Sequence, residues 1–178
     1  MAGWNVLATS LEGHRDTLLM QLRRFGRFRG AGYRNVVVGQ VEEVPVFLER
    51  VREALARDPF LPSALAKLVP IEKTVRIEAR NAATTLTEAA EPFLDRLAGG
   101  SFFVRLERRG LKGQLHSPTL EREVADPVWR ALESRGTHPR VDFRDPDNIL
   151  VIETIGDEAG LTVLSRALRH DYPFVKVR

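Results

Sequence analysis

The chain has 178 residues, of which 43% are hydrophobic and 29% charged, with a formal net charge of +3 and no cysteine. This composition is typical of a globular protein with one ordinary domain or two small ones, and the lack of cysteine excludes disulfides and thiolate metal sites. No apolar run approaches the roughly 20 residues of a membrane-spanning helix, and the N-terminus lacks a signal-peptide pattern, so we expect a cytoplasmic protein with no membrane partner.

The first half of the chain alternates strands and helices. We expect a strand at residues 4–9, a helix up to about Phe25, a short strand at 35–38, an amphipathic helix ending at Asp58 and a further strand within 65–78. This β-α-β-α-β order is that of a ferredoxin-like module that lacks part of its sheet.

Arginine is concentrated in one part of this first half. Residues 17–41 contain five arginines and no acid. We interpret residues 27–34, which alternate basic and aromatic side chains around two glycines, as a loop. Phe28 and Tyr33 either stack on RNA bases or pack into the core. Our interpretation favours packing for the two rings and RNA contact for some of the arginines.

The second half begins after a small polar run, residues 81–85, which we take as the domain boundary. A capping-box pattern predicts a helix over 85–98 with a kink at Pro92. A second helix starts at Ser117 and is expected to break near Pro127. Strands are predicted around 141–143, 149–155, 161–164 and 174–177, with a short helix at 165–170.

The stretch from Ser101 to Pro118 carries the strongest functional signal. Its first seven residues alternate as a half-buried strand, and the following loop, residues 108–113, holds three cations and no acid. Ser117 suits an N-cap and Pro118 a first helical position. Strand, basic loop and helix start would together aim positive charge and free N–H groups at one place, which suits a phosphate. The alternative is a simple connection whose arginines are solvated.

A catalytic constellation is not recognisable in the sequence. The four histidines have no metal-ligand spacing, and neither a nucleophile elbow nor a phosphate-binding glycine loop is present. The glycines at 30 and 32 precede a strand, whereas those of a dinucleotide loop follow one. We therefore expect no catalytic residue, no metal and no cofactor, and a protein that is not an enzyme.

Two runs in the second half, FFVRLERRGLKGQLHSPTLEREV and PRVDFRDPDNILVIETIGDEAGLTVLSRALRHDYPFVKV, resemble a THUMP domain over residues 84–178. THUMP is an ancillary RNA-binding domain of tRNA thiouridine synthases, some RNA methyltransferases and pseudouridine synthases. The first half, with WNVLATS and LVPIEKTVRIE, is similar to the ferredoxin-like domain that precedes THUMP in the small adaptor for tRNA N4-acetylcytidine formation.

This resemblance implies an α+β fold, with a ferredoxin-like N-terminal half (residues 1–80) packed on a C-terminal THUMP domain (residues 84–178). It implies a non-catalytic adaptor that binds the acceptor end of tRNA and presents it to a modification enzyme, such as the acetyltransferase of cytidine N4-acetylation. Two alternatives are an RNA-modifying enzyme, or enzyme subunit, with an unrecognised active site, and a protein–protein scaffold.

The predicted RNA-binding residues are basic or polar and come from the loop, the helix start and the region around the domain boundary. They are Arg105, Arg108, Arg109, Lys112, Gln114, His116, Arg122, Arg29, Arg34, Lys67 and Lys73. Arg108, Arg109 and Lys112 are each expected to hold a phosphate. For Lys67 and Lys73 the alternative is a surface salt bridge.

Overall fold

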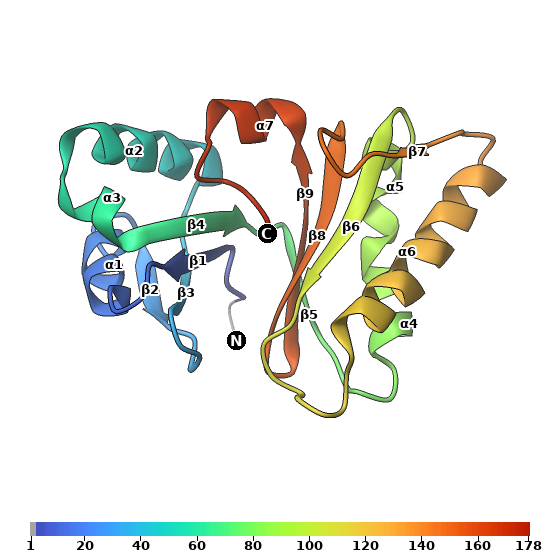
Figure 1. The fold of residues 1–178 in the computed structure, drawn as a ribbon, viewed down its shortest axis with the longest axis horizontal. Coiled ribbons are helices and arrows are strands. Elements are labelled where there is room, and N and C mark those ends of the chain that lie inside the picture. The colour runs from blue at the N-terminus through green and yellow to red at the C-terminus, as the bar shows by residue number, and fades with distance from the viewer. Residues whose placement is uncertain (1–2) are drawn as a thin grey trace. The chain divides into compact units, whose positions relative to one another are not determined.

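A computed structural model describes residues 3–178 and divides the chain into two compact units (Figure 1). The first unit runs to Ile71 and also includes Arg169–Arg178, whereas the second comprises Glu72–Leu168. Each unit has one β-sheet with helices, so the predicted α+β class is confirmed. The boundary between the units lies ahead of the polar run at 81–85, and the first unit contains both ends of the described chain.

The first unit has four strands in the order β2-β3-β1-β4, and every neighbouring pair is antiparallel. This is the β-α-β-β-α-β arrangement of ferredoxin-like motifs, with one additional short helix before the last strand. Its elements are β1 (Val6–Ser10), α1 (Arg15–Leu22), β2 (Arg27–Gly30), β3 (Val36–Gln40), α2 (Val44–Arg57), α3 (Phe60–Ala64) and β4 (Leu65–Pro70).

The segment that we interpreted as a loop contains the strand β2, so that part of the prediction is wrong. β2 pairs with β3 because the side chain of Phe28 holds this strand against the core. The ring is buried and stacks on Phe47 of α2 with ring centroids 5.8 Å apart. A Cβ at Gly39 would overlap the Phe28 ring, so glycine makes room for it. The packing interpretation is confirmed for Phe28, whereas Tyr33 is half-buried.

Residues 65–78 form two strands of different sheets rather than one strand. Pro70, which has no N–H to donate, is the last residue of β4. The next two residues then donate to different sheets: the N–H of Ile71 bonds to the carbonyl of Asn5 at 2.8 Å, and that of Glu72 to the carbonyl of Leu161 at 3.0 Å. Hydrophobicity along the chain does not reveal such a change of sheet.

The second unit has five strands in the order β5-β9-β8-β6-β7. β6 is parallel to both of its neighbours, and the other pairs are antiparallel. The helices of this unit lie on one face of the sheet and enclose a core with it (Figure 1). Its elements are β5 (Lys73–Arg76), α4 (Ala82–Ala90), η1 (Glu91–Phe93), α5 (Leu94–Leu97), β6 (Ser101–Glu107), α6 (Ser117–Ser134), β7 (Arg140–Val141), β8 (Asn148–Ile155) and β9 (Glu158–Ser165).

Prolines act differently in the two long helical segments. The first is interrupted near Pro92 as predicted, because α4 and α5 are separated by the 3-10 turn η1. α6 continues through Pro127, so the predicted break there is wrong. Buried side chains on both sides of this proline, including Val124 and Val128, hold the two halves on one core and outweigh the lost hydrogen bond. No helix within residues 3–178 has the length and apolar character to cross a membrane.

The last residues of the chain return to the first unit after α7 (Arg166–Asp171). Val175 forms a parallel bridge with Leu68, whose N–H bonds to the carbonyl of Phe174 at 2.9 Å. The hydroxyl of Tyr172 donates to Glu49 of α2 at 3.1 Å. The segment that we assigned to the THUMP part of the chain, YPFVKV, therefore extends the sheet of the first unit beside β4.

Candidate functional site

The candidate site is built on the loop that joins β6 to α6. Its backbone has positive φ at Gly110 (97°), Leu111 (49°) and Gly113 (79°), and glycine adopts such angles without a steric penalty. The side chains of Leu111 and Leu115 pack against the core of the unit and anchor the loop. The residues beside these anchors face solvent, and they include Lys112, Gln114 and His116.

Arg109 has a different role from the predicted one. Its guanidinium donates to Oε2 of Glu107 at 3.0 Å and to Oε2 of Glu153. The two glutamates lie opposite each other on parallel strands, and the exposed side-chain fractions are 15% for Arg109, 12% for Glu107 and 0% for Glu153. We therefore correct the prediction. Arg109 pairs with two carboxylates, of which that of Glu153 is fully buried, and its release to a phosphate would break both ion pairs.

Arg108 and Arg105 are half-buried, and their guanidinium groups are engaged inside the unit. Nη1 of Arg108 donates to the carbonyl of Gly110 and closes the loop on itself. The guanidinium carbon of Arg105 lies 5.2 Å from the ring centroid of Phe103. The Nε of each arginine is buried without a hydrogen-bond partner. Both side chains support the strand and loop from within, unlike the free surface cations that the sequence suggested.

The start of α6 completes the site. His116 is the N-cap, one residue before the predicted Ser117, and its Nδ1 lies 2.8 Å from Oγ1 of Thr119. The first turn contains no acid, and its N–H groups carry the partial positive charge of a helix N-terminus. We call the four exposed residues at this end of α6 the loop–helix surface: Lys112, Gln114, His116 and Arg122. Within residues 3–178, neither Lys112 nor Arg122 has an ion pair.

Glu121 fixes this helix start to the sheet, and sequence reasoning missed it. β7 pairs with β6 only at Ser101 and Phe102, so the edge of β6 beyond them has no strand partner. There Oε2 of Glu121 accepts the N–H of Leu106 at 2.8 Å. The bond gives the backbone N–H of Leu106 an acceptor and fixes the position of α6 along β6.

The remaining predicted contacts are dispersed. Arg29 is exposed on β2, and Arg34 is exposed and paired with Glu12, which is a type of surface ion pair of small energetic value. Lys73 is half-exposed on the edge strand β5. Lys67 is buried, so the prediction that its ammonium lies at the surface is wrong. RNA contact by Arg29, Arg34 and Lys73 stays a prediction.

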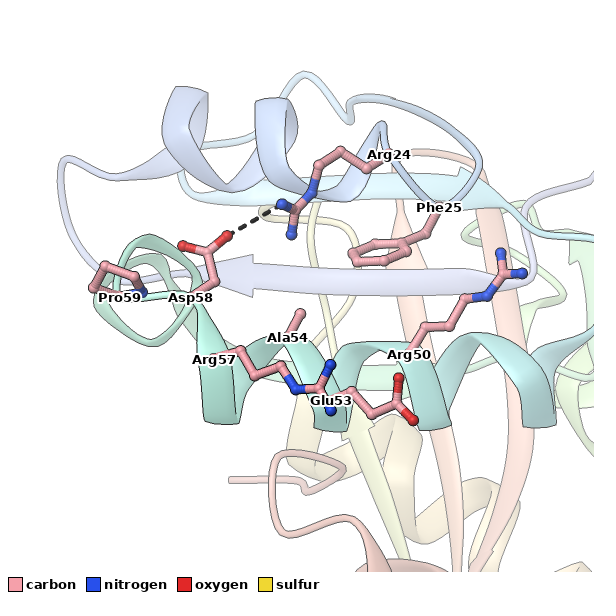
Figure 2. Close-up of a pocket in the computed structure, with 8 residues that line it drawn as sticks. All are labelled: Arg24, Phe25, Arg50, Glu53, Ala54, Arg57, Asp58 and Pro59. Atoms are coloured by element: carbon pink, nitrogen blue, oxygen red, sulfur yellow. Dashed lines mark hydrogen bonds and ion pairs between the residues drawn. The ribbon is translucent and has the colours of Figure 1, made fainter.

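Sequence reasoning also missed a pocket in the first unit. This pocket of about 580 Å³ brings Arg24 together with Arg50 and Arg57 of α2 around the half-buried ring of Phe25 (Figure 2). Nη1 of Arg24 bonds to Asp58 at 3.1 Å. Both α1 and α2 end beside this pocket, and helix C-termini carry partial negative charge. Arg57 lies in the last turn of α2 and Arg24 pairs with Asp58, so part of the arginine excess has a role without a ligand.

Comparison with known proteins gives one family match and several similar chains. The family description of the THUMP domain matches residues 80–164. A curated protein of Methanosarcina mazei named "Probable tRNA sulfurtransferase" is 38% identical over 55 residues, which cover 31% of this chain and 13% of that protein.

Two solved structures share the fold. TrmN from Thermus thermophilus has a TM-score of 0.64 and 23% identity, covering 90% of this chain and 45% of that one. A 4-thiouridine synthetase, solved as an RNA complex with bound ATP, has a TM-score of 0.54 and 12% identity, covering 91% of this chain and 41% of that one. The chain therefore spans less than half of the length of each of these relatives.

These findings contradict the prediction that the protein is not an enzyme. The similar chains include a synthetase and a protein named as a sulfurtransferase, and both names denote enzymes. A sequence without a recognisable catalytic motif was weak ground for that prediction, because the fold of this chain also occurs as part of enzymes.

Proposed function

Residues 80–164 form a THUMP domain, and from this premise we propose that the chain binds tRNA through the loop–helix surface and delivers it to a base-modification active site. The proposal is supported most directly by the exposed cations Lys112 and Arg122, which lack carboxylate partners at the start of an 18-residue helix. The names of the similar proteins, which include a tRNA sulfurtransferase and a synthetase in complex with RNA, agree with it.

The proposed contacts follow from the chemistry of each group. The ammonium of Lys112 and the guanidinium of Arg122 hold phosphates, while the amide of Gln114 and the ring of His116 offer hydrogen bonds to phosphate or ribose. The N–H groups of the first turn of α6 add fixed partial positive charge. Arg109 takes no part in these contacts, because it is engaged with Glu107 and Glu153.

The active site that uses the bound tRNA belongs, in this proposal, to a tRNA-modifying enzyme of which this chain is a part or a partner. The similar proteins favour thiolation as its chemistry, because their names include a sulfurtransferase and a 4-thiouridine synthetase. The resemblance of the sequence to acetylation adaptors offers cytidine N4-acetylation by a partner acetyltransferase as the second chemistry.

A salt titration of tRNA binding tests the contact surface. The double variant Lys112→Ala/Arg122→Ala should weaken binding to bulk tRNA and lower the slope of log K against log salt by about 1.4 to 1.8, because each lost phosphate contact accounts for about 0.7 to 0.9. Arg130→Ala is the matched control, since Arg130 is exposed on the same helix outside the surface. Equal slopes for the double variant and the wild type would remove the loop–helix surface from the proposal.

Nucleoside analysis distinguishes the two chemistries. The chain should be purified from its native host with its bound proteins and RNA, and the tRNA of a strain lacking the chain should be compared by mass spectrometry with that of the parent. Loss of a thiolated nucleoside supports the first chemistry, and loss of N4-acetylcytidine supports the second. A tRNA pool with unchanged modifications would contradict a role in modification even if binding is measured.

A further inference from the structure

The end of β6 remote from the loop–helix surface carries an unusual exposed ring. Phe143, between β7 and β8, is 71% exposed and is the most exposed large hydrophobic side chain within residues 3–178; Val141 beside it is 53% exposed. One part of the ring rests on Phe103, with centroids 5.4 Å apart and planes inclined by 35°. The other side of the ring is open to solvent, so it offers a flat apolar platform.

A pocket of about 650 Å³ lies against this ring. Its lining includes Phe143 together with three arginines, Arg140, Arg144 and Arg166, and two acids, Asp142 and Asp147. Every one of these residues belongs to the second unit. The strand pairing Ser101↔Arg140 places the pocket at the first residue of β6. A seven-residue strand is roughly 20 Å long, which separates this pocket from the loop that follows the strand.

The two acids of the pocket, Asp142 and Asp147, already have hydrogen-bond or ion-pair partners within the unit. Oδ1 of Asp142 accepts the N–H groups of Arg144 at 2.8 Å and Asp145 at 3.1 Å, and these bonds lower the pKa of the Asp142 carboxyl. Arg166 donates to Asp147 at 2.6 Å and also pairs with Asp145 at 3.1 Å. The turn that carries Phe143 is therefore held in place by bonds of its own.

Two arginines of the pocket remain free. Arg140 and Arg144 are exposed, and neither has an ion pair with any residue in the part of the chain from 3 to 178. Arg144 directly follows Phe143 in the sequence, and Arg140 lies three residues before it. Two free guanidinium groups beside an accessible aromatic face are the combination with which proteins bind single-stranded RNA, because a base stacks on the ring while cations hold the adjacent phosphate.

We propose that this pocket binds an unpaired nucleotide of the RNA, with its base on Phe143 and its phosphate between Arg140 and Arg144. This inference rests on the proposed function for the identity of RNA as the ligand, but it concerns a different site. In this inference a nucleotide at the end of an RNA strand, or in an RNA loop, lies at the amino end of β6. The phosphate contacts of the loop–helix surface lie at its carboxyl end.

Binding to short RNAs tests this proposal. A fluorescently labelled single-stranded oligouridine and a blunt-ended RNA duplex are titrated with the full chain and with Phe143→Ala. Loss of stacking should weaken oligouridine binding by about 5- to 150-fold and leave duplex binding unchanged. Phe143→Trp should retain the binding, because it keeps a stacking surface. Phe60→Ala is the matched control, since Phe60 is also a largely exposed ring.

The cations are tested in the same assay. Arg140→Ala/Arg144→Ala should lower the salt slope of oligouridine binding by about 1.4, since each contact to a single strand accounts for about 0.7. Arg50→Ala/Arg57→Ala removes two exposed arginines of the first unit as a charge-matched control. Thermal melts identify any variant that fails to fold, and if Phe143→Ala does so, the salt slope of Arg140→Ala/Arg144→Ala decides the outcome.

The outcomes separate this inference from the proposed function. Oligouridine binding that is indifferent to Phe143→Ala, or a loss of equal size on the duplex, overturns the inference and leaves the exposed ring to a protein partner. If tRNA binding depends on Lys112 and Arg122 but oligouridine binding is unchanged in Phe143→Ala, only the inference fails. If oligouridine binding depends on Phe143 while intact tRNA is not bound, only the proposed function fails.

Discussion

The two ends of β6 use charge in opposite ways. At its carboxyl end a cation, Arg109, is held between the carboxylates of Glu107 and Glu153. At its amino end an acid, Asp147, accepts bonds from the N–H and hydroxyl of Ser101, at 2.8 and 3.2 Å, and from Arg166. In both places the bonded group ties β6 to other parts of the unit, and unpaired cations lie nearby in the sequence: Lys112 three residues after Arg109, and Arg140 and Arg144 ahead of Asp147.

This difference shows that the partners of a charged residue, more than its type, decide its role. Arg109 and Lys112 are three residues apart in one basic loop, yet only the first faces carboxylates of its own and the neighbouring strand. Removing a cation of the first kind should change stability, whereas removing one of the second kind should change ligand binding alone.

Arg109→Ala should have the largest effect on stability. It breaks the ion pairs of Arg109 with Glu107 and Glu153, and breaking a buried ion pair from one side costs about 3 to 5 kcal/mol. Urea denaturation followed by circular dichroism measures this change. Lys112→Ala is the control and should stay within about 0.5 kcal/mol of the wild type. If both variants are equally stable, the two loop cations do not differ as described.

Gly100→Ala should have the next largest effect, at the amino end. An added Cβ would overlap the Oδ2 of Asp147 and force this carboxylate away from the N–H of Ser101. A displaced partner leaves a donor unsatisfied, which costs about 1 to 3 kcal/mol. Gly99→Ala provides a matched control, because an added Cβ there meets nothing within 4 Å. The same denaturation assay should separate the two, and equal stability would contradict the contact.

Acid should weaken the amino end of β6. The N–H of Ser101 lowers the pKa of Asp147, and the N–H groups of Arg144 and Asp145 lower that of Asp142, from an ordinary value of 3.8. A depressed pKa in the folded state contributes stability that is present above about pH 4 and is lost as the pH falls through the folded value. Denaturation between pH 7 and pH 2.5 measures this loss, and Asp147→Asn should show a shallower decline than the wild type.

His116→Asp should give the smallest change in stability, and with the opposite sign. The N-cap of α6 has no side-chain capping bond, so an aspartate there should stabilise the helix by about 0.5 to 1 kcal/mol. The same carboxylate should weaken tRNA binding by repelling phosphate. His116→Asn separates the two effects, because it caps without charge. Unchanged tRNA affinity for the aspartate variant would place the phosphate elsewhere.

Local sequence patterns predicted much of the fold. The spacing of the apolar residues located α2 and α6, and alternation located β6. The strand β2 was missed because residues 27–34 contain two glycines and three basic residues, and its stability depends on Phe28 packing on Phe47. The change of sheet after Pro70 was missed as well, because the partners of β4 and β5 are distant in the sequence.

The candidate site was predictable only where its residues face solvent. Lys112, Gln114, His116 and Arg122 are exposed as expected. The sequence contains one indication that Arg109 is paired, since Glu107 lies two residues earlier on the same strand face. Its second partner, Glu153, comes from another strand, and only the register of β6 against β8 brings it near.

The bridge between Leu68 and Val175 has a consequence for the order in which the protein folds during synthesis. Domains generally fold as units while the ribosome advances, the N-terminal one first. Here the free edge of β4 waits for a strand that is translated about a hundred residues later, after the whole second unit. A nascent chain therefore exposes an open sheet edge, which is a template for wrong pairing between chains. Ribosome pausing within the second unit would prolong that exposure and raise the need for chaperones.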